Sequence, residues 1–539
     1  MILSASSIAE LKSPSECGLR VWIDRNTDVI ALEPSGHARY LREQGKAHEK
    51  RVLDELTAVC PSWVDMNGFD NPRATSETRD AVLEADSLIY QGSLKATMLI
   101  SGKPITVEGY PDFMIPGANG WEIADAKLVK SVFETTAREG VRERPDASHI
   151  LLQLRLYGWL FEQNFPGLEF ELKIYTGSGA TEVVEYLDGG DALGTLEEVY
   201  GLRNLPNEPH TNVALSKCRP CKFQKHCWTR AEAAKSVALV GGIKQTDAAA
   251  LNAAGISSFE QLLKRLDAES LTRLLSPKKT RPEDPENQGR ASKILENARS
   301  LSEGAPIRRL DATGTVVEVE NAICDDDSYV MFDVENLPEA GAERKSVYIW
   351  GLQVFGAKGD RFRPAIADFE PGADERCWRR FLEISRDIML DHPGIKFVHW
   401  SHHDKTCVAT YVERYGDDAH GTAAKVVESL VDLMRVVDGA VALPIAGTSL
   451  KQVEKVAGFV RSTDVAKGDD SIAAYVRARE TRDPAEQTRI IDDLVAYNRE
   501  DLEATWAVHQ WLIGEGVAEA DDKHFALEAL SACDAPSRP

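Results

Sequence analysis

The stretch YVMFDVEN, residues 329–336, decides how the second half of this 539-residue chain is interpreted. Its apolar residues predict a buried strand, which Asp333 and Glu335 interrupt two positions apart. Successive side chains of a strand point to opposite faces, so these two carboxylates share one face. A pair of acids on one strand face can hold a divalent cation when further acids approach it.

The sequence around this strand predicts an α/β domain. The stretch VYIWGLQVFG, residues 347–356, is a second strand that can pair with the first, and IKFVHWS, residues 395–401, is a third. The stretch LVAYNREDLEATWAVHQWLI, residues 494–513, has the apolar spacing of an amphipathic helix. We expect the whole domain to cover residues 313–515.

Two of these elements supply further acids. Asp404 follows the third strand, and Tyr497 and Asp501 share one face of the helix at positions i and i+4. Four acids from separate elements can hold two Mg²⁺ or Mn²⁺ ions about 4 Å apart, an arrangement that hydrolyses phosphodiester bonds. Tyr497 would orient the attacking water. Asp432, in the stretch LVDLM, is the alternative to Asp404.

The order D-x-E, then D, then Y-x-x-x-D resembles the DEDD 3′–5′ exonucleases of the tyrosine type, and the YprB-like branch is the most similar. The resemblance implies an RNase H-like fold and a metal-dependent exonuclease. It also implies that the active site consists of Asp333, Glu335, Asp404, Tyr497 and Asp501.

A second candidate site lies in the first half of the chain. The stretches ITVEGYPDFMI (105–115) and GWEIADAKLV (120–129) predict a β-hairpin, and alternation puts Asp125 and Lys127 on one face. Asp112, on the preceding strand, can converge on them. Two carboxylates and an ammonium suit a divalent metal and an attacking water, although an ordinary surface salt bridge is the open alternative.

The flanking residues extend this pattern. The stretch 149–165 predicts a helix on which Gln153 and Tyr157 share a face, and His48 lies on an upstream helix. The order of these residues resembles the RecB-like branch of the PD-(D/E)xK nucleases, which implies a restriction-endonuclease-like domain. The resemblance assigns the metal to His48, Asp112 and Asp125, with Lys127 in the active site and Gln153 and Tyr157 supporting the site or the DNA.

The stretch CRPCKFQKHC, residues 218–227, places three cysteines where a metal or a cluster could bind them, and such a site needs a fourth ligand. Several RecB-like nucleases have one cysteine before the nuclease core and a C-x-x-C-x5-C group after it. The resemblance therefore implies a [4Fe-4S] cluster, with zinc as the alternative, held by Cys17, Cys218, Cys221 and Cys227. The cluster would staple the two ends of a domain covering residues 1–235.

The middle of the chain, residues 236–312, has a different character. Residues 237–266 predict helix, glycine turn and helix, which resembles a helix-hairpin-helix element whose Gly241–Gly242 amides could meet a phosphate. A helical linker is the open alternative. Residues 274–293, which include Lys278, Lys279 and Arg281, predict a solvated linker, and residues 516–539 predict a loose tail.

Composition limits the function classes. The net charge of −23 argues against a protein coated in basic residues that holds nucleic acid by bulk attraction. The chain has no apolar run long enough to span a membrane and no signal peptide, and its nine cysteines suit a reducing cytoplasm. No G-x-x-x-x-G-K-[ST] motif is present, so a helicase would be a separate partner, expected by family analogy only.

Together these patterns predict an α/β protein with two nuclease domains joined by a helical segment. We expect a metal-dependent deoxyribonuclease that processes single strands or ends, typical of DNA repair. The alternatives are an RNA exonuclease and a non-catalytic nucleic-acid-binding scaffold with a structural or redox cluster. The sequence does not set the oligomeric state.

Overall fold

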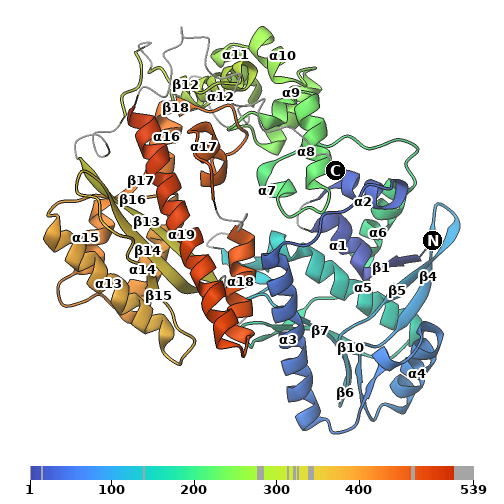
Figure 1. Ribbon diagram of the computed structural model, residues 1–539. Coiled ribbons are helices and arrows are strands. Elements are labelled where there is room, and N and C mark those ends of the chain that lie inside the picture. The colour runs from blue at the N-terminus through green and yellow to red at the C-terminus, as the bar shows by residue number, and fades with distance from the viewer. Residues whose placement is uncertain are drawn as a thin grey trace, which may run out of the picture. The chain divides into compact units, whose positions relative to one another are not determined.

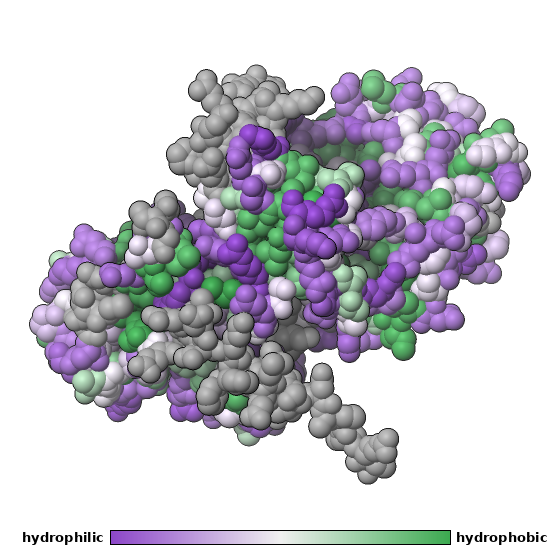
Figure 2. All heavy atoms as spheres, turned by 90° about the horizontal axis from the view of Figure 1, so that it is seen from above, coloured by the Kyte–Doolittle hydropathy of each residue, from purple (hydrophilic) through white to green (hydrophobic). Residues whose placement is uncertain are grey.

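The structure is a computed structural model that describes residues 2–13, 16–136, 140–275, 285–311, 315–319, 323, 327–337, 345–462 and 468–514. The chain forms two compact units with a mixed α/β fold, as predicted. Unit 1 is formed mainly by Met1–Thr211 and Lys217–Lys225, and unit 2 by Asn212–Ser216, His226–Leu337 and the chain from Ser346 onward. No described helix is long and apolar enough to cross a membrane. The face in Figure 2 is mostly hydrophilic, with hydrophobic residues gathered in a few places.

Unit 1 is built on two sheets (Figure 1). The larger has the order β11-β10-β7-β6-β3-β2, with bounds Thr181–Val184, Phe170–Thr176, Gly120–Lys127, Phe113–Gly117, Leu88–Tyr90 and Trp63–Asp65. The smaller has the order β1-β5-β4, with bounds Ile2–Ser4, Lys103–Gly109 and Leu94–Ile100. A separate ribbon pairs β8 (Phe133–Thr136) with β9 (Gly140–Glu143). The antiparallel β6–β7 pair confirms the predicted hairpin.

The predicted strand over residues 105–115 is wrong in one respect, because the chain leaves one sheet and enters another within it. Pro111 has no N–H to continue a ladder. The N–H of Asp112 instead donates to Oδ1 of Asp125 at 3.1 Å, and its carbonyl accepts from the N–H of Gln91 at 2.9 Å. The break thus places Asp112 beside the end of β7.

Helices α1 to α6 belong to unit 1, and two of them, α3 and α5, pack on the larger sheet. Their bounds are α1 Ala5–Lys12, α2 Gly18–Asn26, α3 Gly36–Val59, α4 Asn71–Glu84, α5 Ser148–Asn164 and α6 Gly190–Arg203. The predicted helix over residues 149–165 is α5, and its Leu151, Leu154 and Leu160 join one core with Ile123 of β7. On the other face Ala124 packs against Val52 of α3. The sheet is therefore covered on both sides, and the residues of β7 alternate between the two covers.

Unit 2 contains a five-stranded sheet with the order β15-β14-β13-β16-β17. The strand bounds are Ala365–Ile366, Ser346–Gly356, Ser328–Leu337, Phe397–His399 and Leu430–Asp432. The three predicted strands are present, with β13 antiparallel to β14 and parallel to β16. The remaining helices of this part are α13 Ala373–Asp391, α14 His402–Tyr415, α15 Thr422–Ser429, α16 Leu433–Ala440, α17 Leu450–Val456, α18 Gly468–Glu480 and α19 Pro484–Ile513.

Helices cover both faces of this sheet (Figure 1). Phe332 of β13 and Trp350 of β14 stack on Phe381 of α13. The next residues along each strand, Asp333 and Gly351, are register partners and point to the opposite face, towards α19. Alternation along β13 therefore turns the acids of the D-x-E motif towards the long C-terminal helix.

Gly351 allows α19 to lie close to the sheet. A Cβ atom at this position would lie 1.9 Å from Oδ1 of Asn498, so a larger residue would push the helix away. Asn498 is fully buried, and its Nδ2 donates to Oδ2 of Asp333 at 2.7 Å. The close approach thus brings α19 and its acids within reach of β13.

The helical segment of unit 2 consists of η3 Val237–Leu239, α9 Gln245–Ala253, α10 Phe259–Arg265, α11 Ala268–Leu275 and α12 Pro285–Glu303. The order helix, glycine turn and helix predicted over residues 237–266 is present as α9, a turn at Gly255 and α10, while Val237–Leu239 form a 3₁₀ turn before Gly241. The carbonyls of Gly241 and Gly242 accept from the side chains of Asn297 and Arg290, so tertiary contacts and not a helix position this turn.

The predicted linker is partly helical, since α12 begins at Pro285. Lys278, Lys279 and Arg281 lie outside the described residues, as does the predicted tail 516–539. The short strands β12 (Ile307–Arg308) and β18 (Val441–Ala442) pair with each other. In the CRPCKFQKHC stretch, Cys218 ends the short helix α7 (Leu215–Cys218), Cys221 lies between two helices, and Cys227 lies within α8 (Gln224–Ala233).

Candidate active sites

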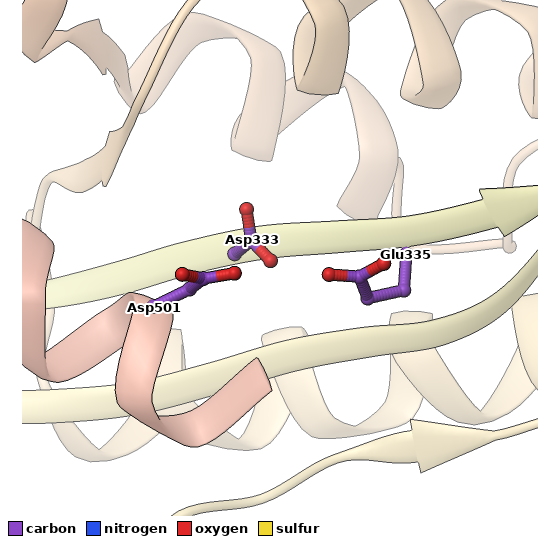
Figure 3. Close-up of side chains that lie close together, drawn as sticks. All are labelled: Asp333, Glu335 and Asp501. Carbon is purple, nitrogen blue, oxygen red and sulfur yellow. The ribbon is translucent and has the colours of Figure 1, made fainter. Parts of the chain in front are cut away.

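Three of the predicted acids in unit 2 converge. Asp333 and Glu335 lie on β13 and Asp501 lies on α19, and each offers a carboxylate oxygen within 4.8 Å of the other two. The three carboxyl groups face one another (Figure 3). Among the described residues this is the only group of three or more histidines, cysteines and acids that meets this distance. Three carboxylates are the hard oxygen ligands that Mg²⁺ and Mn²⁺ prefer, so the donor set fits these ions.

The electrostatics of this acid trio favour a bound cation. Burial, followed by repulsion from Asp501 and Asp404, raises the pKa of Asp333 well above its ordinary value. Burial and then the charge of Asp501 raise the pKa of Glu335 to about 8. The charged forms of these groups are costly while no cation neutralises them. A divalent ion would remove both the desolvation cost and the repulsion.

Neutral donors fix the two acids of β13. Asn498 donates to Asp333, as described above. Oε2 of Glu335 accepts from the hydroxyls of Ser471 at 2.9 Å and Tyr348 at 3.2 Å. None of the three donors was predicted, although Tyr348 and Asn498 lie in the stretches that predicted a strand and a helix.

Two cations lie against the same site, and no motif indicated either of them. The guanidinium of Arg461 forms ion pairs with Asp501 and with Glu454, at 2.5 and 2.7 Å. The ammonium of Lys451 lies 4.7 Å from the ring centroid of Tyr497. Lys451 and Glu454 belong to the short helix α17, which packs on α19.

Tyr497 lies at the site as the sequence predicts, and it is 2% exposed. Burial, followed by the negative charges of Asp501, Glu335 and Asp333, raises the pKa of its hydroxyl far above the ordinary value of 10.0. The hydroxyl therefore stays protonated at any pH used in an assay. It can orient a water molecule by hydrogen bonding, but it cannot act as a general base.

Asp404 lies outside the trio but close enough to influence it. Its charge contributes to the raised pKa of Asp333, and its Oδ2 lies 3.3 Å from Nδ1 of His399. Asp432, the rival residue, caps α16 by accepting from the N–H of Arg435 at 3.2 Å. Because Asp432 already serves a helix terminus, Asp404 stays our prediction for the remaining metal-binding acid.

The protonation of the trio leads to a prediction about stability. A carboxyl group whose folded-state pKa is raised stabilises the fold at pH values below its unfolded pKa, and that contribution is lost as pH rises through the folded pKa. For Glu335 this window runs from 4.5 to about 8. We expect the melting temperature of the metal-free protein to fall across this window.

Saturating Mg²⁺ or Mn²⁺ should reverse that fall, because a ligand that binds only the folded state stabilises it by about 2.7 kcal/mol at a hundred times its Kd. The metal-induced rise in melting temperature should therefore increase from pH 6 to pH 8.5, as measured by calorimetry with and without chelator. A rise that is equal at both pH values would contradict the protonated state of the trio.

The predicted residues of unit 1 also converge. Oδ1 of Asp125 accepts from the N–H of Asp112, and Oδ2 of Asp112 accepts from the N–H of Ala126 at 2.9 Å. The ammonium of Lys127 lies 2.8 Å from Oδ2 of Asp125. Asp125 is fully buried, unlike the acid of an ordinary surface salt bridge. A buried pair of this kind argues for a site and not for a solvated strand face.

Charge compensation in this site is uneven. Burial by itself favours the neutral amine, but the carboxylates of Asp125 and Asp112 outweigh it and raise the pKa of Lys127. Burial, followed by repulsion from Asp125, raises the pKa of Asp112 well above its ordinary value in spite of Lys127. The charged form of Lys127 is therefore favoured in the metal-free site.

Gln153 and Tyr157 face this site from α5. Nε2 of Gln153 donates to the hydroxyl of Tyr157 at 2.7 Å. Burial, followed by the charges of Asp125 and Asp112, raises the pKa of Tyr157 well above its ordinary value. The predicted i, i+4 pair is thus formed, and its phenol stays neutral beside the two acids.

His48 lies on α3, is 5% exposed, and places Nε2 2.9 Å from the carbonyl oxygen of Tyr175. When Nε2 donates to this carbonyl, Nδ1 remains available to a metal, the arrangement typical of a ligating histidine. In the described structure, however, His48, Asp112 and Asp125 do not all lie within 4.8 Å of one another. Its role as a ligand stays a prediction.

Two further residues belong to the site and were missed. Oε1 of Glu49 accepts from the hydroxyl of Tyr90 at 2.7 Å and from Nε2 of Gln91 at 2.8 Å. The same Nε2 donates to Oδ1 of Asp112 at 2.8 Å. Glu49 follows His48 directly in the sequence, so its position next to a predicted ligand was the one available signal.

The cysteine stretch is attached to the N-terminal region within unit 1. The ammonium of Lys222 forms an ion pair with Asp24, and the carbonyl of Lys222 accepts from the N–H of Leu32 at 2.8 Å. Sγ of Cys221 accepts from the N–H of Phe223 at 3.5 Å. These contacts bring the region of Cys218 and Cys221 to segments close to Cys17, the N-cap of α2.

The family model described as the RNase H superfamily matches residues 330–513. Solved structures with some similarity include one titled "Crystal structure of SSO0001", with 16% identity over 42% of this chain and 85% of that chain and a TM-score of 0.22. A putative exonuclease from Eubacterium rectale is 14% identical over 42% of this chain and 87% of that chain, with a TM-score of 0.26. At these TM-scores neither likeness bears on the function of this chain, and no curated protein matched the sequence.

The matched region contains the whole acid trio together with Asp404 and Tyr497. The fold of this superfamily implies a divalent metal, a nucleic-acid substrate and nuclease activity. We therefore conclude that residues 330–513 of this chain form an RNase H-like domain.

Proposed function

We propose that this protein is a metal-dependent nuclease whose RNase H-like domain removes nucleotides from the 3′ ends of DNA. One observation carries the proposal: three carboxylates of this domain converge within 4.8 Å. Burial and mutual repulsion raise the pKa values of Asp333 and Glu335, so their charged forms need a further cation. A structural cluster of acids would be expected to hold matched cations. Here Arg461 contacts only Asp501 of the three.

The chain's own residues would divide the work as follows. Asp333, Glu335 and Asp501, with Asp404, would hold Mg²⁺ or Mn²⁺. The bound ions would lower the pKa of the attacking water and stabilise the leaving oxygen. Tyr497 would orient the water through its neutral hydroxyl. The attack forms a bond between the water oxygen and phosphorus and breaks the bond from phosphorus to the 3′ oxygen, which takes up a proton.

We infer a second nuclease site in unit 1, of the PD-(D/E)xK type. The support is the burial of Asp112 and Asp125 beside the half-buried Lys127 at the end of β7, with Glu49 and Gln91 holding Asp112 in place. His48, Asp112 and Asp125 would hold the metal, and Lys127 would stabilise the negative charge that develops on the phosphate. The chain would then contain two nuclease domains, in residues 1–235 and 313–515.

We also propose that Cys17, Cys218, Cys221 and Cys227 bind a [4Fe-4S] cluster. A zinc ion held by the same four thiolates is the alternative. The N–H of Phe223 donates to Cys221, and such hydrogen bonds to sulfur are a feature of cluster sites.

We expect Cys218→Ser to lose the cluster and to destabilise unit 1. The Lys222–Asp24 ion pair joins the two segments that the cluster would link, and these two residues are 198 positions apart in the sequence. Closing a loop of this length stabilises by several kcal/mol, and its loss should lower the melting temperature accordingly. Iron and acid-labile sulfide, measured after anaerobic purification, should fall from about four atoms of each per chain to near zero.

Cys60→Ser is the matched control, because this half-buried cysteine lies outside the C-x-x-C-x5-C pattern. It should keep both iron and stability. A wild-type protein that contains zinc and no iron would overturn the cluster, and a stable, iron-loaded Cys218→Ser variant would overturn the staple.

The proposed function is tested by incubating the protein with labelled single-stranded and duplex DNA and with RNA, in Mg²⁺, Mn²⁺ or chelator. DNA blocked at its 3′ end separates exonuclease action from internal cleavage. We expect metal-dependent shortening of DNA from the 3′ end. Cleavage confined to RNA would replace the substrate assignment, and the absence of cleavage on every substrate would favour a binding scaffold.

A further inference from the structure

Arg461 is a cation built into the acid site of unit 2. Its Nε and Nη2 donate to the two carboxylate oxygens of Glu454 at 2.8 and 2.7 Å. Nη2 also lies 2.5 Å from Oδ1 of Asp501, one of the three acids that would hold the metal. Glu454 is 2% exposed, so a buried carboxylate aims the guanidinium at the trio. Arg461 thus occupies one member of the metal-binding set.

We propose that Arg461 is the counter-cation of the metal-free site, and that a divalent ion displaces it from Asp501 and frees it to bind a substrate phosphate. This inference rests on the proposed function, because it takes Asp501 to be a metal ligand. It assigns Arg461 two successive partners, a carboxylate before metal binding and a phosphodiester after it.

The geometry supports displacement without loss of position. Glu454 binds Arg461 through two oxygens, so the guanidinium stays at the site when Asp501 releases it. A two-pronged contact of this kind is stronger and better oriented than the single contact to Asp501. The metal therefore competes with Arg461 for Asp501, the weaker of its two contacts.

The guanidinium also has a donor to spare. Nη1 is buried and makes no hydrogen bond to any residue that the structure describes, and it lies 3.9 Å from Oε2 of Glu500. A buried N–H without an acceptor is costly unless a ligand satisfies it. With Nη2 released, Arg461 would present two adjacent N–H groups, the fork that matches two oxygens of a phosphate.

Lys451 distinguishes displacement of Arg461 from Asp501 from a general repulsion between nearby cations and the metal ion. Its charge also acts on Asp501 and Glu335, and its ammonium lies over the ring of Tyr497. Removing any cation near the trio should strengthen metal binding somewhat, because the repulsion felt by the ion falls. Only removal of Arg461 also uncovers the Asp501 oxygen, so Arg461→Gln should have the larger effect.

The experiment measures Mn²⁺ affinity by calorimetry, thermal unfolding with and without Mn²⁺, and steady-state cleavage at saturating Mn²⁺. Wild type is compared with Arg461→Gln, Lys451→Gln and Arg499→Gln, the last an exposed residue of α19 that pairs with Glu503. We expect Arg461→Gln to bind Mn²⁺ roughly tenfold more tightly, the scale of one charge-assisted hydrogen bond. It should melt below wild type without metal, close that gap when metal is bound, and turn over at least tenfold more slowly.

Lys451→Gln should tighten Mn²⁺ binding by a smaller factor, and Arg499→Gln should match wild type throughout. Equal tightening by the Arg461 and Lys451 variants, or equal destabilisation by Arg461→Gln with and without metal, would overturn the displacement. Unchanged turnover would overturn the phosphate contact. If Arg461→Gln does not fold, Arg461→Met replaces it, and unchanged Mn²⁺ affinity in that variant overturns the displacement.

These outcomes are distinct from a failure of the proposed function. If wild type binds Mn²⁺ no better than Asp333→Asn, the trio is not a metal site and the proposed function falls with the inference. If wild type binds Mn²⁺ through Asp333 while Arg461→Gln leaves that affinity unchanged, only the inference falls.

Discussion

An Asp333→Asn variant is expected to lose 3′-end cleavage by about a thousandfold or more, while it melts at a higher temperature than wild type in the absence of metal. The loss follows because Asp333 belongs to the acid trio, and a neutral amide cannot replace a carboxylate between two metal ions. Preorganised charge at a reacting phosphate accounts for rate factors of this size.

The gain in stability follows from the same geometry. Burial, followed by repulsion from Asp501, Asp404 and Glu335, raises the pKa of Asp333 well above its ordinary value. At neutral pH the folded protein must therefore carry a costly charge or take up a proton, and asparagine removes both costs. Each kcal/mol recovered would raise the melting temperature of a domain this size by roughly 2–4 °C.

The control for this variant is Asp493→Asn, which changes an exposed acid of α19 that pairs with Arg489. It should keep both activity and melting temperature. Cleavage by Asp333→Asn at the wild-type rate would remove the trio from catalysis. A metal-free melting temperature well below that of wild type would show that the trio stabilises the fold, contrary to the repulsion inferred from its geometry.

The sequence predicted what depends on local spacing. The two-residue period of β13 placed Asp333 and Glu335 on one face, and the helical period placed Tyr497 and Asp501 on another, because both periods follow from backbone geometry alone. The β6–β7 hairpin and the pairing of Gln153 with Tyr157 on α5 were predicted for the same reason.

The sequence could not predict contacts made between distant segments. Asn498 meets Asp333 across 165 residues, and it does so because Gly351 lets the helix approach. Arg461 reaches Asp501 from a segment with no motif of its own. Such pairs depend on how helices dock on a sheet, and no fixed spacing encodes docking.

Other errors came from reading a continuous apolar run as one element. The run over residues 105–115 crosses between two sheets, because Pro111 interrupts the ladder. Within residues 237–266 the apolar residues Val237–Leu239 form a 3₁₀ turn, and the two helices of the segment are α9 and α10. Burial explains these residues in both cases, but burial alone does not determine secondary structure.

Asp333→Asn should keep the cleavage made by unit 1. Adding Lys127→Met is expected to lower that remaining cleavage about a thousandfold, and Lys127→Met should also destabilise the metal-free protein. The ammonium of Lys127 lies 2.8 Å from Asp125, which is fully buried. Without this ammonium, β7 offers no cation to offset the charges of Asp112 and Asp125. Removing one partner of a buried pair typically costs about 3–5 kcal/mol.

A divalent metal should restore most of this stability, because it would neutralise the same two carboxylates. We expect Mn²⁺ to raise the melting temperature of Lys127→Met by more than it raises that of wild type, while cleavage stays absent. This separation of binding from turnover identifies Lys127 as the group that stabilises charge on the phosphate. Lys50→Met, which removes an exposed lysine of α3 paired with Asp54, is the matched control.

The double variant Asp333→Asn, Lys127→Met decides whether the chain has one active site or two. If both sites act, each single variant keeps the products of the other site, and only the double variant is silent. If Lys127→Met loses stability but the product pattern does not change, the pair with Asp125 is structural and unit 1 binds nucleic acid without cutting it. The carboxylates of Asp125 and Asp112 raise the pKa of Lys127 in the metal-free site and favour its charged form, so we expect a loss of activity to report the loss of that charge. It would mean that a fixed positive charge beside the two acids stabilises the transition state.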